Sequence, residues 1–273
     1  MSVSLKGTLV LVGAGKMGGA MLEGWLASGA DPKKIVALDP FASDEMKALL
    51  AKHGVALNPA IASVTNAEVV LVAVKPQMMD EVLPTIVGLG TSNPLILSVA
   101  AGKTIATFER FFGKSAAVIR TIPNTPAAIG RGITAMCANP NVSPAQLQLA
   151  TNLLGAIGEV VTVDREDLID CVTAVSGSGP AYVFYMTECL ANAAEKIGIP
   201  PALAMQLARA TVAGSAELMR VSGTDAATLR KNVTSPNGTT HAALQVFMAS
   251  DGMMPLFEKA VKAAADRSKE LAS

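Results

Sequence analysis

The chain has 273 residues, a length typical of one large domain or two smaller ones. Its 22 Lys and Arg residues balance its 22 Asp and Glu residues, and no Lys/Arg-rich run occurs, which excludes an ordinary nucleic-acid-binding module. Hydrophobic residues reach 51%, but polar residues such as Glu188, Gln206 and Arg209 interrupt the candidate spans well short of the ~18 apolar residues that a membrane helix needs.

The first half alternates short β-branched runs with helical patterns, which is typical of a parallel sheet with crossover helices. We expect strands at residues 8–12, 34–39, 69–74, 95–99, 117–120, 133–137 and 160–163. We expect helices at residues 17–28, 43–53, 76–89 and 143–157. The predicted fold class is therefore α/β, with an N-terminal Rossmann-type dinucleotide-binding domain.

The pattern changes after Asp164, where apolar residues recur at helical spacing and strand signals disappear. Breakers at residues 199–201, 223, 235–238 and 251–252 divide this region into five or six helices. We place the boundary there, with an α/β domain at residues 1–163 and an all-helical domain at residues 164–273. The apolar surplus of the chain is expected to form a large core and a subunit interface.

A G-x-G-x-x-G motif at residues 13–18 directly follows the first predicted strand. Gly13 permits a tight turn, Gly15 lets the backbone approach a pyrophosphate, and Gly18 allows close packing of helix on strand. The helix that follows directs its free N–H groups and positive dipole end at the phosphates. A glycine turn that binds nothing is the alternative.

Asp39 ends the second predicted strand. A carboxylate at that place can accept hydrogen bonds from the hydroxyls of an adenosine ribose and repels a 2′-phosphate, which favours use of NADH. No Lys or Arg follows it in residues 40–45. The alternative is an ordinary aspartate that caps the next turn.

Three more loops follow predicted strands, at residues 74–77, 98–102 and 120–126. Ligands bind beyond the carboxyl ends of strands in an open α/β sheet, so these loops are expected to contact a cofactor. Lys75 is equally well explained as a solvated lysine at a strand end. Asn124 lies between two prolines, in a loop whose nearly fixed backbone suits a group that holds a ligand still.

Two segments of the helical half differ from ordinary helix sequence. Residues 176–180 and 235–240 are rich in small and hydroxyl side chains, and each is expected to be a loop that opens a helix. Hydroxyls and free N–H groups at a helix start can bind a small carboxylate. Well-capped turns between helices are the alternative.

The N-terminus carries no export signal, and Cys137, Cys171 and Cys189 form no close-spaced pair. We expect free thiols in a reducing, cytoplasmic compartment. The two histidines, His53 and His241, lie far apart without a cysteine nearby, so no metal site is expected.

The combined motifs resemble the pyrroline-5-carboxylate reductase family, the last enzyme of proline biosynthesis. They run in the family's order from residue 13 to 240, and the segments 173–182 and 233–240 are specific to it. The resemblance implies hydride transfer from NADP or NAD in reduced form to the C=N carbon of 1-pyrroline-5-carboxylate, giving L-proline. It also implies a homodimer formed through the C-terminal helices, often five such dimers in a decamer, with residues shared across the dimer.

The resemblance also implies roles for individual residues. Substrate contacts would come from Ser235, Asn237, Gly238, Thr239 and Thr240, with Thr240 hydrogen-bonded to the imine nitrogen. Cofactor contacts would come from Gly13, Gly15, Lys16, Met17, Gly18, Asp39, Asn58, Ala73, Val74, Lys75, Pro76, Ser98, Ala100, Gly102, Asn124 and Thr125.

Two positions depart from the family pattern. Asn237 stands where glycine is usual, and asparagine is the residue that best replaces glycine in a left-handed backbone. Asp39 differs from the Ser/Asn-Arg pair of many NADP-preferring relatives.

Two other functions remain open on sequence alone. A β-hydroxyacid-type dehydrogenase shares this domain order but needs a lysine as acid/base in the helical half, where Lys231 lies nearest a candidate substrate loop. The other is a non-catalytic NAD(P)-sensing protein that passes its ligand state to a partner, and the intact loop at residues 235–240 argues against it.

Overall fold

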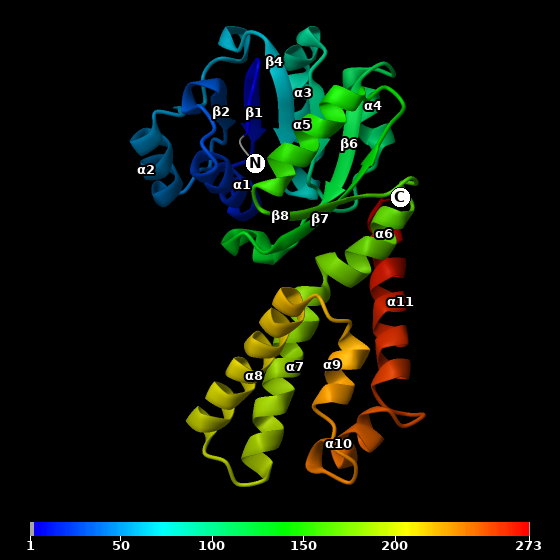
Figure 1. Cartoon of the computed structure of the whole chain (residues 1–273). Helices are drawn as coiled ribbons and strands as arrows, with labels where there is room; N and C mark the ends of the chain where they lie inside the picture. The colour runs from blue at the N-terminus through cyan, green and yellow to red at the C-terminus, as the bar shows by residue number, and fades with distance from the viewer. Residues whose placement is uncertain (1–2, 273) are drawn as a thin grey trace. The chain divides into compact units, whose positions relative to one another are not determined.

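The computed structural model describes residues 3–272 and divides the chain into two compact units. The first unit consists of two segments of the chain, one ending at Gly177 and one beginning at Ala264. The second unit comprises Ser178–Ala263. A sheet flanked by helices builds the first unit, and helices alone build the second (Figure 1). Residues 164–177, where the strand pattern has already stopped, thus belong to the sheet unit.

The first unit contains an eight-stranded sheet of order β3-β2-β1-β4-β5-β6-β7-β8. All neighbouring strands are parallel except β6 and β7, which are antiparallel. The strands are β1 (Thr8–Val12), β2 (Ile35–Leu38), β3 (Ala56–Leu57), β4 (Ala67–Val72), β5 (Leu95–Ser98), β6 (Ala117–Ile122), β7 (Gly132–Ala138) and β8 (Gly158–Thr162). The predicted α/β Rossmann-type fold class is confirmed, and each predicted strand is present with small shifts at its ends. The short β3 was not predicted.

Helices cover both faces of the sheet. In β1, Leu9 and Leu11 point into one core and Val10 and Val12 into the other. The first core receives α1 (Lys16–Ala27), α2 (Asp44–His53) and α5 (Pro144–Gly155), and the second receives α3 (Met79–Ile86), α4 (Ile105–Phe112) and α6 (Leu168–Val172). Burial on both faces explains why the central strands are continuous apolar runs.

Local sequence signals set several helix ends. The Ser43 hydroxyl accepts a hydrogen bond from the N–H of Met46 at the start of α2, and Ser143 forms a capping box with Gln146 at the start of α5. The helix predicted at 76–89 is instead 3₁₀ at Pro76–Met78, α-helical in α3 and 3₁₀ again at Val87–Ser92. Gly88 and Gly90 weaken the helical preference in that last part.

Trp25 joins α1 to α5 inside the first core. It is the only tryptophan in the chain and is fully buried. Its indole Nε1–H donates a 2.8 Å hydrogen bond to the carbonyl oxygen of Leu153. The indole ring is therefore packed in the core, and its N–H group has a hydrogen-bond acceptor there.

Arg120 on β6 is the centre of a buried charged cluster. Its side chain is 2% exposed and donates to Glu166 at 3.1 Å and to Asp170 at 3.0 Å. The Ser268 hydroxyl donates to the same Asp170 oxygen at 2.8 Å, and Glu166 accepts from the N–H of Ile105 at 2.8 Å. The cluster ties α4, α6 and the end of α11 (Met253–Ala272) to the sheet.

The segment at 176–180 is not the loop that its composition predicts. Thr173–Gly177 is one turn of π-helix that connects α6 to α7 (Gly179–Lys196). The hydroxyls of Thr173 and Ser176 donate back to the carbonyls of Ile169 and Val172, so these polar side chains are hydrogen-bonded within the helical segment itself. The sequence prediction was wrong here because composition alone does not register these bonds.

The second unit contains α7, α8 (Pro201–Ser222), α9 (Ala226–Asn232), α10 (Thr239–Phe247) and the first part of α11. Helices α7 and α8 pack along each other. Many large apolar side chains are exposed on these helices, among them Phe184, Tyr185, Leu218, Met219, Val246 and Phe257. Such a surface is typical of a face that packs against another subunit. No helix within residues 3–272 has the length and apolar character to cross a membrane.

Candidate functional site

The glycine loop between β1 and α1 has the geometry that its sequence predicts. Gly13 has a φ of +91°, and a Cβ added there would lie 2.9 Å from the carbonyl oxygen of Ala73 on the neighbouring strand end. A Cβ on Gly18 would overlap the carbonyl oxygen of Gly13. Gly13 and Gly18 therefore allow α1 to begin close against the sheet.

Gly15 has a different surrounding. A Cβ built there would meet no atom within 4 Å, so the space in front of the Gly15 backbone is open. We call this open space the cradle. Gly15 is also the N-cap of α1 and makes no side-chain cap bond, so the first-turn N–H groups of this 12-residue helix face that opening. The cradle fits a phosphate group of a dinucleotide.

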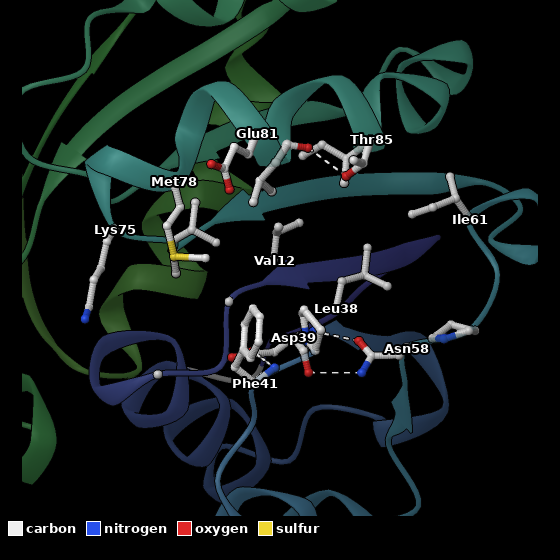
Figure 2. Close-up of a pocket in the computed structure, with 18 residues that line it drawn as sticks. Val12, Leu38, Asp39, Phe41, Asn58, Ile61, Lys75, Met78, Glu81 and Thr85 are labelled. Atoms are coloured by element: carbon white, nitrogen blue, oxygen red, sulfur yellow. Dashed lines mark hydrogen bonds between the residues drawn. The ribbon is translucent and has the colours of Figure 1, made fainter.

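A cavity of about 840 Å³ opens beside this loop, at the carboxyl ends of β1, β2 and β4 (Figure 2). It is lined by predicted cofactor residues: Gly13, Gly15, Asp39, Asn58, Ala73, Val74 and Lys75. A neighbouring hollow of about 380 Å³ is bordered by Lys16, with Gly15 and Asp39 again. The structure thus brings together half of the residues expected to bind the cofactor.

Other predicted cofactor residues support the loops and do not line either cavity. Ser98 is fully buried, and its hydroxyl accepts from the N–H of Ala100 at 3.3 Å. Gly102 has a φ of +71° and lies against Leu271 of α11. The remaining residues outside the cavity linings are Met17, Gly18, Pro76, Asn124 and Thr125. Their contacts to a cofactor stay a prediction.

Both polar atoms of the Asn124 side chain form hydrogen bonds with protein backbone. Its Nδ2 donates to the carbonyl of Ser176 at 3.1 Å, and its Oδ1 accepts from the N–H of Ile133 at 2.9 Å. Asn124 thus connects the end of β6 to β7 and to the π-helical turn. The fixed loop expected from its two flanking prolines is present, and this side chain adds to its rigidity.

Sequence reasoning missed part of the cavity wall. Helix α3 and the turn before it contribute one side, and Phe41 stands beside Asp39 with 80% of its surface exposed (Figure 2). The lining residues not predicted include Phe41, Ile61, Met78, Glu81, Val82 and Thr85. The apolar face of the helix predicted at 76–89 was the available signal.

The second predicted turn lies in the other unit, between α9 and α10. Asn237 has a φ of +56°, so it occupies the left-handed region where the family usually has glycine. The N–H of Gly238 donates to the carbonyl of Ser235 at 3.1 Å, and the Ser235 hydroxyl occupies the space that a Cβ on Gly238 would fill. Helix α10 then begins at Thr239 with no side-chain cap bond. The turn thus places a hydroxyl beside first-turn N–H groups of α10.

The conformation of Asn237 leads to a prediction. Asn237→Gly should leave stability and activity close to wild type, because glycine adopts this backbone without strain. Asn237→Val should cost about 1–2 kcal/mol, since a β-branched residue is strained at positive φ. Thermal unfolding of the two variants checks this, and equal stability of both would contradict a left-handed requirement.

Within residues 3–272, no three His, Cys, Asp or Glu side chains gather in a group that could hold a metal ion. The three cysteines are free thiols, and burial raises the pKa of the Cys137 thiol on β7.

Comparison with protein-family models divides the chain in a similar way. The model described as "Pyrroline-5-carboxylate reductase dimerisation" matches residues 166–271. The model described as "NADP oxidoreductase coenzyme F420-dependent" matches residues 8–102, which include the glycine loop and Asp39.

Relatives match over nearly their whole lengths. The pyrroline-5-carboxylate reductase of Pseudomonas aeruginosa is 39% identical over 97% of this chain and 96% of its own, and that of Synechocystis is 40% identical over 96% and 97%. The Coxiella burnetii reductase structure superimposes with a TM-score of 0.91 at 34% identity, over 98% of this chain and 100% of that one. A Plasmodium falciparum pyrroline carboxylate reductase with NADP bound gives 0.82 at 26% identity, over 98% and 99%. The chain therefore belongs to the pyrroline-5-carboxylate reductase family.

Proposed function

We propose that the protein reduces 1-pyrroline-5-carboxylate to L-proline with a reduced nicotinamide dinucleotide. A hydride adds to the C=N carbon, the π electron pair of that bond moves to nitrogen, and the nitrogen carries a proton taken from water. Full-length similarity to reductases of this name supports the proposal. The observation that carries it is the turn at 235–240, whose left-handed Asn237 leads directly into α10.

The dinucleotide, when bound, supplies the hydride, and the chain supplies its binding site. The backbone N–H groups of the glycine loop hold the pyrophosphate, in the cradle that Gly15 leaves open. Residues after β4, β5 and β6 border the nicotinamide and its ribose: Ala73, Val74, Lys75, Pro76, Ser98, Ala100, Gly102, Asn124 and Thr125. Rigid loops such as that of Asn124 hold the ring in one orientation.

The second turn binds the carboxylate of the substrate. The N–H of Thr239 and the hydroxyl of Ser235 donate to its oxygens. The N–H of Gly238, expected from the resemblance to do the same, instead donates to the Ser235 carbonyl and closes the turn. Helix α10 has nine residues, and the positive end of its dipole favours an anion at its start. Asn237 contributes by giving the turn the left-handed residue that it requires.

Thr240 orients the imine nitrogen through a hydrogen bond from or to its hydroxyl. A protonated imine is already activated, and hydride addition removes its positive charge, so the site needs orientation more than a strong acid. Positioning of reacting groups alone can lower a barrier by several kcal/mol. The redox chemistry then belongs to the dinucleotide.

Steady-state kinetics test the activity. The full-length protein is mixed with the five-membered imine acid and either NADH or NADPH, and both dinucleotide oxidation and L-proline are measured. Stoichiometric proline is the expected result. Oxidation of a 2-hydroxy acid with no imine reduction would favour a β-hydroxyacid-type dehydrogenase. Dinucleotide binding with no turnover of either substrate would favour a sensing protein.

Thr240→Ala should lower kcat/KM for the imine at least tenfold, because the ring nitrogen loses its orienting hydroxyl. Dinucleotide affinity, measured by calorimetry, should stay unchanged because the glycine loop is intact. Thr240→Ser, which keeps the hydroxyl, should recover most of the loss. Turnover of Thr240→Ala near that of wild type would remove this role.

The apolar faces of α7, α8, α10 and α11 support a homodimer through the C-terminal helices, in agreement with the dimerisation model matched there. We propose that five dimers form a decamer, and sedimentation equilibrium distinguishes the two sizes. The free thiols of the described residues suit the reducing cytoplasm, which is the location that we propose.

A further inference from the structure

The Asp39 carboxylate at the end of β2 is held by backbone on both oxygens. Oδ2 accepts a 2.8 Å hydrogen bond from the N–H of Ala14, inside the glycine loop. Oδ1 accepts a 2.9 Å hydrogen bond from the N–H of Phe41. The carboxylate therefore has a fixed place relative to the loop, and each oxygen keeps a further lone pair for a ligand.

Asn58 holds the backbone of the same residue. Its Oδ1 accepts from the N–H of Asp39 at 2.7 Å, and its Nδ2 donates to the Asp39 carbonyl at 3.0 Å (Figure 2). The N–H of Asn58 donates to the carbonyl of Ala37 at 2.8 Å, and Asn58 has a φ of +51°. Asn58 thus fixes the backbone of Asp39, and the carboxylate cannot swing aside to admit a second anion without breaking its bonds from Ala14 and Phe41.

Few cationic side chains lie around Asp39 in the described part of the chain. Among the described residues that line the two cavities it borders, the cationic side chains are Lys16 and Lys75. Figure 2 shows Lys75 well apart from Asp39. Residues 40–45, which follow Asp39 in the chain, contain no Lys or Arg. A phosphate placed beside Asp39 would meet the negative charge of its carboxylate, with Lys16 as the one cationic side chain among the described residues that line the smaller hollow.

We propose that the locked Asp39 carboxylate makes this reductase select NADH over NADPH, with Asn58 as its positioning residue. The ribose 2′-hydroxyl of NADH can donate to the carboxylate, whereas the 2′-phosphate of NADPH carries about −1.5 to −2 charges and is repelled. A like charge at short range in a partly enclosed site costs more than it does in open water. This inference rests on the proposed function only in taking a nicotinamide dinucleotide as the ligand.

Calorimetric titration of the full-length protein with NADH and with NADPH, in the absence of imine, tests the proposal without any turnover. Wild type should bind NADH at least tenfold more tightly than NADPH. Asp39→Ser should weaken NADH binding, strengthen NADPH binding and abolish that ratio. Asp39→Asn removes the charge but keeps an acceptor for the loop, and it should reduce the preference for NADH over NADPH. This variant replaces the serine variant in the test if the serine variant does not fold.

Asn58→Ala should lower the NADH to NADPH ratio severalfold without inverting it, because the carboxylate is retained but less fixed. Asp44→Asn removes one exposed negative charge outside the cavity linings and should leave the ratio unchanged. Equal or tighter binding of NADPH by wild type, or an unchanged ratio in both Asp39 variants, would overturn the proposal. Failure to reduce the imine with either dinucleotide would contradict the proposed function and not this ratio.

Discussion

Replacing Arg120 by methionine is expected to lower the free energy of unfolding by about 3–5 kcal/mol, the range found when one partner of a buried ion pair is removed. The change leaves Asp170, whose side chain is 9% exposed, and the partly buried Glu166 without their cation. It also weakens the attachment of α6 and of Ser268 on α11 to the sheet. Urea denaturation followed by circular dichroism measures the loss.

Two further variants test the physical reason. Adding Glu166→Gln and Asp170→Asn to Arg120→Met should recover a large part of the stability, because the cost comes from uncompensated carboxylates. Arg165→Met removes an exposed guanidinium that hydrogen-bonds Asp167 and lowers the pKa of that carboxyl. Exposed pairs contribute little, so this variant should unfold like wild type. A loss in Arg120→Met no larger than in Arg165→Met would refute the structural role of the buried cluster.

Gly18→Ala is expected to destabilise the first unit by about 3 kcal/mol or more, at the upper end of the overpacking range. The added methyl group would overlap the carbonyl oxygen of Gly13, which is backbone and cannot rotate away. Because α1 must then move from the strand, the dinucleotide cradle is lost together with the packing. Calorimetric unfolding and NADH titration measure the two effects.

Gly15→Ala separates binding from folding. The methyl group meets no protein atom within 4 Å but enters the opening where the pyrophosphate is proposed to lie. The melting temperature should therefore stay near that of wild type, while dinucleotide affinity falls at least tenfold. Gly155→Ala, at the end of α5 with equally open space, is the matched control and should change neither. Unaltered NADH affinity in Gly15→Ala would place the phosphates elsewhere.

The sheet and the glycine loop could be predicted from sequence because their causes are local. Strands buried on both faces must be continuous apolar runs, as Val69–Leu71 and Leu95–Leu97 are. Gly13 and Gly18 were read as requirements of a turn and of close packing, and both requirements are visible in the structure. Asn237 was read in the same way and has the left-handed backbone expected of it.

The direction of β7 was not predicted because a strand pattern carries no direction. The connection from Ile122 to Gly132 is too short for a helical crossover, and this length was the signal that the next strand runs back. Helix α4 was also missed. Its Thr104 cap is a clear start signal, but the segment is only eight residues long.

The contacts of Arg120, Asn58 and Asn124 depend on residues distant in sequence and could not be read from the chain. Asn124 bonds Ser176 across 52 positions, and Arg120 bonds Asp170 across 50. Asp39 shows the same limit at closer range. The sequence allowed two roles for Asp39, a ribose acceptor and a turn cap. Both are compatible with the observed bond to Phe41, because one carboxylate oxygen can accept from the Phe41 N–H and from a ribose hydroxyl.

The place of Trp25 makes the two halves separately observable by fluorescence. The single indole lies in α1, whereas both tyrosines of the chain, Tyr182 and Tyr185, belong to α7. Indole emission therefore reports on melting of the sheet half, and phenol emission on the helical half. Since a reduced nicotinamide absorbs where indole emits, quenching of Trp25 by energy transfer should also follow occupancy of the cradle without any label.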